Sequence, residues 1–288
     1  MTLKVCRNVS LELVWSELAP LIEGVLRMDA ACSLSRVVEL VHLLCTCEPP
    51  HHDALHAHLS AQVQAVCLSV AARITCMREY ADEWRTFNAG AATLDRVCRH
   101  LNCAMRLDSH GAGVRAGASV RDVRWLCLKL WHSHVFCAHE ATLIGEATAL
   151  VALVRDGRHG NDVLVRVAAF ADSMVALGAA LQPTASAASK VDSLYVSAFE
   201  TPYAAATAAY YARESTDYIN NNGVVAYMLK AKLRLDEEAQ RSRLVLDARS
   251  CDRVMAVLDA TLVAAHSASI ELATADALLR GESVTLAL

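Results

Sequence analysis

The stretch "SLYVSAFETPYAAATAAYYAREST", residues 193–216, concentrates aromatic side chains in a chain that is only 5% aromatic. Their spacing places them near one face of a helix: Tyr195, Phe199, Tyr203, Tyr210 and Tyr211. A stacking surface for single-stranded nucleic acid needs a basic groove beside its aromatics, but this segment offers only Arg213. The pattern therefore favours a packing face. Pro202, which lacks a backbone N–H, predicts a kink or a helix restart after Glu200 and Thr201.

Composition limits the classes of protein to which the chain can belong. With 288 residues and 55% hydrophobic composition, it can build one large or two modest domains. The net charge of −4 and the lack of Lys/Arg runs argue against nucleic-acid binding. No uninterrupted apolar run approaches the roughly 20 residues of a membrane span, and residues 1–15 lack the apolar region of a secretory signal. We expect a cytoplasmic or nuclear protein without membrane contact.

The chain has eleven cysteines, scattered and often inside apolar runs such as "AVCLSV" and "RWLCLKL". Disulfide frameworks belong to small, loop-rich secreted domains. We therefore expect these residues to serve as small buried hydrophobic side chains.

Long segments show the 3.6-residue period of amphipathic helices, and no long window alternates as a strand does. Five segments precede residue 137, the fourth being "YADEWRTFNAGAATLDRVCRHL" and the fifth starting near Ser119, the predicted N-cap. Five more follow, of which the last is residues 250–279. "DEEAQRSR", residues 236–243, predicts a solvated helix face with an i,i+4 pair of Glu237 and Arg241. The prediction is an all-α protein of two consecutive five-helix bundles.

Motifs for catalysis are weak. No G-x-S-x-G elbow is present, and "HGAGVRAG" lacks the G-K-[ST] of a phosphate loop. Within residues 45–58 lie six residues of types that bind zinc: Cys45, Cys47, His51, His52, His56 and His58. Their spacing is not a common zinc pattern, so a solvated, His-rich helix start is favoured over a metal site. We predict no enzyme activity, no cofactor and no metal, and we place Trp131 in the core.

The opening stretch, continued to Leu246, resembles the second helical repeat of the cullin N-terminal arm. The family pattern begins Y-x-x-x-F-E-x-x-[FY] and continues with a Tyr-Tyr pair and a Glu-Ser pair. The residues of this sequence that match it are Tyr195, Phe199, Glu200, Tyr203, Thr207, Tyr210, Tyr211, Glu214 and Ser215. After a short break, a second set is in step with the family: Tyr227, Met228, Ala231, Arg234, Leu235, Glu237 and Glu238.

Upstream segments are similar to the first cullin repeat. "YADEWRTF" resembles its Y-x-x-x-W-x-x-[FY] helix, and "LELVWSELAPLI" and "VRWLCLKLW" resemble its first and last helices. "VHLLC" and "NGVVAYM" are most similar to the elongin-binding cullins. The resemblance implies a leader at 1–10, a first repeat at 11–137, a second repeat at 138–283 and a tail at 284–288, with the repeats forming an elongated arm.

In cullins, an adaptor of the Skp1, elongin C or BTB fold sits on the second and fifth helices of the first repeat. Carried onto this sequence, the resemblance implies these adaptor-binding residues: Leu34, Val37, Val38, Val41, His42, Cys47, Val120, Arg121 and Arg124. Val38 replaces the aromatic residue of the family's second-helix pattern, and loss of such an anchor costs roughly 2 kcal/mol, about 30-fold in affinity.

Cullins are ubiquitin-ligase scaffolds whose C-terminal domain holds a RING subunit. That domain has no counterpart in this sequence, so the resemblance implies a non-catalytic, truncated cullin that binds an adaptor, elongin B–elongin C being favoured, and recruits no RING subunit. Such a chain would compete with full-length cullins as a decoy, as a viral mimic does. The alternative is a helical interaction module that has lost adaptor binding and recruits another partner. The oligomeric state is left open.

Overall fold

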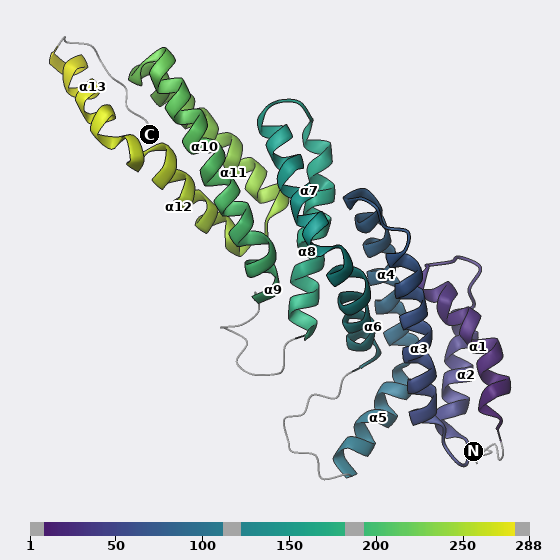
Figure 1. Ribbon diagram of the computed structural model, residues 1–288. Coiled ribbons are helices and arrows are strands. Elements are labelled where there is room, and N and C mark those ends of the chain that lie inside the picture. Colours follow the sequence, from purple (N-terminus) through teal and green to yellow (C-terminus); the bar gives the residue numbers. More distant parts are fainter. Residues whose placement is uncertain (1–8, 112–121, 182–192, 280–288) are drawn as a thin grey trace. The chain divides into compact units, whose positions relative to one another are not determined.

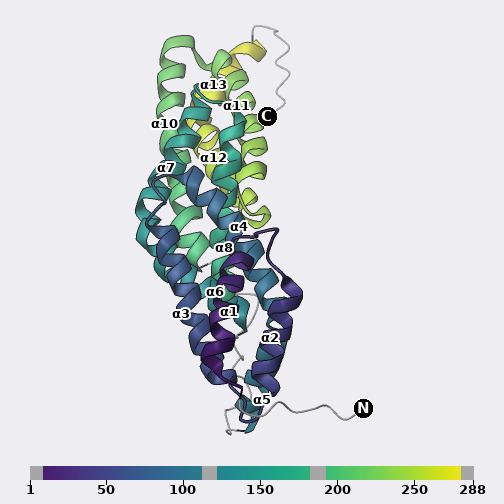
Figure 2. The ribbon, with the colours of Figure 1, turned by 90° about the vertical axis from the view of Figure 1, so that its right-hand side faces the viewer.

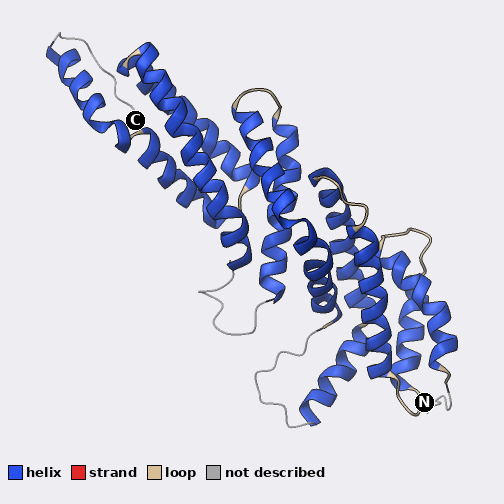
Figure 3. Ribbon diagram, viewed as in Figure 1, coloured by secondary structure: helices blue, strands red, loops and turns tan. Residues whose placement is uncertain are grey.

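The computed structural model describes residues 9–111, 122–181 and 193–279, and these ranges contain helices, turns and loops but no β-strand (Figure 3). The first part comprises helices α1 (Leu11–Leu26), α2 (Leu34–Thr46), α3 (His52–Ala71), α4 (Met77–Val97), α5 (Arg99–Gly111), α6 (Val123–Trp131) and the π turn η1 (His132–Phe136). The all-α prediction is confirmed within these ranges.

The rest of the chain continues with α7 (Cys137–Arg155), the 3-10 turn η2 (Asn161–Val163), α8 (Leu164–Leu181), α9 (Ser193–Tyr195), the π turn η3 (Val196–Glu200), α10 (Thr201–Asn222), α11 (Val224–Val245), the 3-10 turn η4 (Ala248–Ser250), α12 (Cys251–Leu262), the 3-10 turn η5 (Ala264–His266) and α13 (Ser267–Leu279) (Figures 1 and 2). The predicted last helix is therefore divided into α12 and α13.

The chain divides into two compact units, which we describe separately. Unit 1 is drawn from residues 1–143 and 176–191, and unit 2 from residues 144–175 and 192–288. The predicted junction of the repeats at residue 137 coincides with the start of α7, and the division between the units falls later in the same helix. The repeat limits remain predictions.

The core of unit 1 is built around Trp131, which is fully buried at the end of α6. Its ring lies 4.5 Å from that of Phe87 and 5.6 Å from that of Trp84, both on α4. Its indole Nε1 donates to the Tyr80 hydroxyl at 3.3 Å, so the one polar atom of the ring is satisfied. The predicted core position of Trp131 is confirmed.

Helix α4 also approaches α1 closely at Gly90. A methyl group placed there would lie 2.5 Å from the Leu26 carbonyl oxygen and 2.7 Å from its Cα. Since these are backbone atoms, no side-chain rotation could relieve the overlap. Glycine is therefore required at this crossing.

In unit 2, the aromatic stretch that opened the sequence forms a packing face, as predicted. Tyr195, Phe199, Tyr203 and Tyr211 are buried and Tyr210 is half-buried. Pro202 lies in the first turn of α10, and the π turn η3 directly precedes it. Within that turn the Thr201 N–H donates to the Val196 carbonyl, five residues back. The helix continues through this segment without a restart, and the irregularity predicted near Glu200 and Thr201 takes the form of the π turn η3.

One sequence prediction holds only in part in unit 2: within residues 236–243, Asp236, Gln240 and Arg243 are exposed, but the segment is not solvated throughout. Glu238, Arg241 and Ser242 are buried, and Arg241 pairs with Glu238 instead of Glu237. Glu238 also accepts from Arg155 on α7 and from the hydroxyls of Tyr203 and Tyr211 at 3.0 and 2.8 Å. Glu238 faces inward because its other partners come from α7 and α10, which the local sequence does not reveal.

The ten cysteines within the described ranges all have free thiols, and four of them are buried: Cys47, Cys67, Cys98 and Cys127. Cys103 and Cys137 are exposed, so the expectation of buried cysteines is confirmed only for part of the set.

Three helical stretches are long and apolar enough to cross a membrane by length and composition: Val123–Arg155, Asn161–Leu181 and Ala248–Asp276. The sequence expectation had found no candidate, because it required an uninterrupted apolar run. In Asn161–Leu181, more than half of the apolar stretch is buried inside the protein. Packing within the protein therefore also explains why its side chains are apolar.

Candidate functional site

Helix α2 presents two different faces. Ser33 caps its N-terminus by accepting from the Arg36 N–H at 3.4 Å. The inner face is apolar and buried, whereas the outer face carries Leu34, Val38 and His42 at i, i+4 and i+8. Leu34 is 43% exposed, Val38 is half-buried and His42 is exposed. We call these three residues the α2 stripe.

Three of the predicted docking residues are not on the surface. Val37, Val41 and Cys47 are 0%, 1% and 4% exposed. The two valines point into the core from the inner face of α2, and the Cys47 thiol donates to the Pro49 carbonyl at 3.2 Å. Their placement at a partner surface is corrected: they support the helix from within.

Helix α5 runs beside α2 and completes the surface. The two helices are in contact, and the His42 and His100 rings lie 4.5 Å apart. Along α5 and the end of α4 lies a groove of about 510 Å³, and Val38 is its one lining residue from α2. The side chains that shape it, with Val38 at one edge, are Arg96, Arg99, His100, Cys103 and Arg106. We call this the α2–α5 groove.

Sequence reasoning missed α5 as a separate element. It predicted one helix from Tyr80 to Leu101, but the backbone turns at Cys98, where φ is −87° and ψ is 17°. No glycine or proline stands in "DRVCRHL" to mark the break. The amphipathic, basic pattern of "RHLNCAMR" is the feature that could have shown a helix with its own exposed face.

The start of α6 holds α4 and α5 together. The Asp122 side chain is its N-cap and accepts from the Trp125 N–H at 2.8 Å. Asn102 of α5 accepts from the Val123 N–H at 3.0 Å and donates to the Asp95 carboxylate at 2.9 Å. This network satisfies the first N–H groups of α6 and fixes α5 against it. Asp122 replaces the predicted cap Ser119, which lies outside the described residues.

Of the three docking residues predicted near the start of α6, only Arg124 lies within the described residues. Arg124 is half-buried, and its guanidinium donates to the Asn88 side chain at 3.2 Å. Its backbone N–H donates to Asp95 at 3.2 Å. Arg124 therefore serves the packing of unit 1 and borders the surface without projecting from it. Val120 and Arg121 lie outside the described residues.

The α2–α5 groove carries positive charge. Arg96, Arg99 and Arg106 are exposed around it. The Asp95 carboxylate also lines it but accepts from Asn102 and the start of α6. Partial burial, with the neighbouring His42 and the Arg99 charge, lowers the pKa of His100, so this ring favours its neutral form. Such a surface attracts an acidic partner segment.

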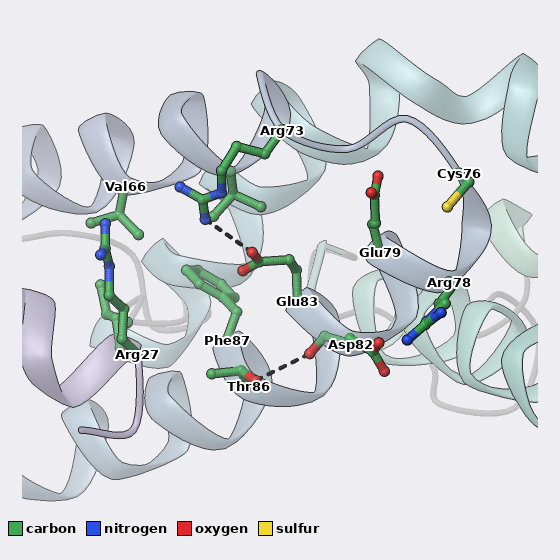
Figure 4. A pocket seen from close by; sticks show the side chains of 12 residues that line it. Arg27, Val66, Arg73, Cys76, Arg78, Glu79, Asp82, Glu83, Thr86 and Phe87 are labelled. Atoms are coloured by element: carbon green, nitrogen blue, oxygen red, sulfur yellow. Dashed lines mark hydrogen bonds and ion pairs between the residues drawn. The ribbon is translucent and has the colours of Figure 1, made fainter. Parts of the chain in front are cut away.

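A second groove in unit 1, of about 690 Å³, lies along α1, α3 and α4 (Figure 4). Several of its charges are paired within the groove or beside it. Arg73 points to Glu83, with 2.9 Å between Nη2 and Oε1, and Arg27 pairs with Glu23 at 2.7 Å. Because opposite charges cancel here, this groove has no dominant sign with which to select a partner.

The Cys/His segment does not assemble a metal site. Among the described residues, which include all of 45–58, no three His, Cys, Asp or Glu side chains are grouped to hold a metal ion. His51 hydrogen-bonds the Val9 carbonyl oxygen at 2.9 Å, and His58 packs on the Trp15 ring at 5.1 Å. Burial, with the nearby Cys47, raises the pKa of the Cys45 thiol to about 11, which keeps it protonated at neutral pH.

The comparisons with known proteins agree with this architecture. Residues 15–286 match the family model described as the cullin alpha solenoid domain. The chain is 25% identical over 207 residues to cullin-1 of Schizosaccharomyces pombe, a match covering 72% of this chain and 26% of that protein. It is 25% identical over 206 residues to cullin-1 of Caenorhabditis elegans, covering 68% and 25%. These matches thus span about a quarter of each curated relative.

Proposed function

The chain belongs to the cullin family, and on that premise we propose that its first repeat docks a ubiquitin-ligase adaptor of the Skp1, elongin C or BTB fold. The single observation that carries the proposal is the α2 stripe beside the basic α2–α5 groove. An exposed apolar edge next to a charged hollow provides both an anchor and a means of orienting an acidic partner.

The proposed contact set differs from the sequence expectation. It keeps Leu34, Val38 and His42 and adds Arg99 and Arg106 from α5. Val38 is small and half-buried, so it supplies less contact area than an aromatic side chain would. We expect the charged rim of the groove to contribute more to orientation and association rate than to affinity.

The favoured adaptor is elongin B–elongin C, because "VHLLC" and "NGVVAYM" are most similar to the cullins that bind it. We also propose a scaffold role without enzyme activity, a cytoplasmic or nuclear location, and no membrane or nucleic-acid partner. On their own, these 288 residues would occupy an adaptor without delivering ubiquitin, and so act as a decoy for full-length cullins.

The test is a binding panel of Skp1, elongin B–elongin C and an isolated BTB domain, measured by titration calorimetry. Val38→Asp places a charge on the α2 stripe and is expected to weaken binding about 30-fold, or roughly 2 kcal/mol. The matched control is Val225→Asp, since Val225 is 61% exposed on α11 of unit 2. Circular dichroism checks that both variants keep their helix content.

Three outcomes separate the proposals. Binding that Val38→Asp weakens and Val225→Asp leaves intact supports the docking surface. Equal weakening by both variants argues against it. Failure of every adaptor at micromolar concentration favours the alternative, an interaction module with another partner. The decoy role is supported only if the wild-type chain also displaces a full-length cullin from its adaptor.

A further inference from the structure

A hollow in unit 2, separate from the α2–α5 groove, is lined by three arginines. It has a volume of about 360 Å³ and lies between the loop after α7 and one face of α11. Its guanidinium groups belong to Arg155, Arg234 and Arg241, and Glu237 is the one carboxylate among the lining residues. This Glu237 is already held by Arg234, with 2.6 Å between Oε2 and Nη1.

The charges behind the hollow do not neutralise the two buried arginines. Arg155 and Arg241 are 4% and 7% exposed and share one carboxylate, that of the fully buried Glu238. Two guanidinium groups against one carboxylate leave a local excess of one positive charge in this buried pair, whereas Arg234 pairs with two carboxylates, those of Glu214 and Glu237. An uncompensated buried charge is costly, so this arrangement favours an additional anion.

Arg241 has hydrogen-bonding capacity left over. Its Nη1 donates to Glu238 and, at 3.5 Å, to the Tyr211 hydroxyl. Its Nε is buried and has no hydrogen-bond partner. A buried N–H without an acceptor costs about 1–3 kcal/mol unless a ligand or water supplies one. The unsatisfied atom belongs to the same side chain that lines the hollow.

We propose that this hollow binds a phosphate-type oxyanion, with Arg241 and Arg155 as its principal ligands. Tetrahedral oxyanions accept several charge-assisted hydrogen bonds at once, which suits the edges of two guanidinium groups. The hollow is larger than one phosphate ion, so the phosphate group of a small ester fits as well as the free ion. Gly157 and Gly160 line the same hollow, so their backbone amide signals should change when an anion binds there.

The experiment is nuclear magnetic resonance of the ¹⁵N-labelled wild-type chain, titrated with inorganic phosphate and, separately, with glycerol 3-phosphate, at constant ionic strength set by sodium chloride. The chain has only 11 glycines, so the Gly157 and Gly160 amide signals can be followed individually. We expect both to shift and saturate in the millimolar range, while Gly90 of unit 1 does not. Tighter binding of the ester than of the free ion identifies an ester as the ligand, and the reverse order identifies the ion.

Variants locate the site. Arg241→Gln is expected to weaken phosphate binding at least about tenfold, because it removes a charge-assisted contact. The matched control is Arg243→Gln, an exposed arginine two positions along α11 that does not line the hollow. If Arg241→Gln unfolds, His159→Ala at the exposed rim replaces it, with about threefold weakening expected.

The wild-type titration alone can overturn the proposal. The proposal is wrong if the Gly157 and Gly160 signals show no saturable shift up to about 20 mM phosphate. It is also wrong if chloride produces the same shift. Equal weakening by Arg241→Gln and Arg243→Gln contradicts it as well, because it shows binding that does not depend on the hollow.

Discussion

Arg155 of α7 and Glu238 of α11 form a bidentate ion pair inside unit 2, with 2.6 Å between Nη2 and Oε1 and 3.2 Å between Nε and Oε2. The two residues are 83 positions apart in the chain. Both side chains are almost fully removed from solvent. The pair therefore fixes α7 against α11 by two directed bonds as well as by apolar contact.

Glu238→Gln is expected to destabilise unit 2 by about 3–5 kcal/mol, because it leaves Arg155 and Arg241 buried without a counter-charge. Urea denaturation followed by circular dichroism measures the loss. The control is Glu237→Gln at the neighbouring, partly exposed position, for which a change below about 1 kcal/mol is expected. Similar losses for the two variants would show that burial of the charge is not the cause.

The same carboxylate predicts a pH dependence. Burial tends to raise the pKa of Glu238, but hydrogen bonds and charge from Arg155 outweigh it, and the pKa lies below its ordinary value of 4.5. The unfolded chain then takes up the proton first as pH falls. The stabilisation is complete above that ordinary value and is lost as pH falls through the folded-state pKa. Denaturation at pH values from 7 downward should show wild type and Glu238→Gln converging in acid; a constant difference would contradict the assignment.

Gly90→Ala should destabilise unit 1 by about 1–3 kcal/mol, because its methyl group would meet the backbone of α1. Gly145→Ala is the matched control within α7, where an added methyl group has no atom within 4 Å. Alanine is the better helix former, so this control should gain about 0.5–1 kcal/mol. Thermal unfolding of both variants gives the comparison, and a neutral Gly90→Ala would disprove the close crossing.

Asn102→Ala is expected to cost about 1–3 kcal/mol, because the buried Val123 N–H loses its acceptor. Hydrogen exchange of the Val123 amide should quicken, and adaptor binding should weaken as α5 loses its attachment to α6. Asn220→Ala, at an exposed position on α10, serves as the control. Unchanged exchange at Val123 would show that Asn102 does not hold the two helices together.

The sequence predicted most of the helices and the aromatic packing face because both depend on local periodicity. Tyr195, Phe199, Tyr203 and Tyr211 repeat at intervals that any helix would place on one side. The irregularity predicted before Pro202 was equally local, since it follows from a missing N–H, and the structure has the π turn η3 there.

Features that depend on distant partners were not predicted. Glu238 and Arg241 belong to a segment whose composition is typical of a solvated face, and only contacts with α7 and α10 reveal their burial. Val37 and Val41 were assigned to the surface with Leu34, Val38 and His42 on the family resemblance, although the helix buries one side. The turn at Cys98 has no glycine or proline to mark it, so the groove beside α5 was not predicted.

The π turn η3 changes the direction in which side chains before and after it project from one continuous helix. Its backbone hydrogen bond joins residues five apart in the chain, whereas the bonds of an α-helix join residues four apart. The side chains before and after the turn are therefore offset about the helix axis. With this offset, side chains on both sides of the turn reach the same segment: the Tyr195 hydroxyl accepts from the Asp247 N–H at 3.2 Å, and the Glu200 carboxylate accepts from Ser250 and Arg253. Removing one residue from 196–200 would restore the α period and rotate Tyr195 by roughly 100° about the axis, which would separate two contacts that now share a single neighbouring segment.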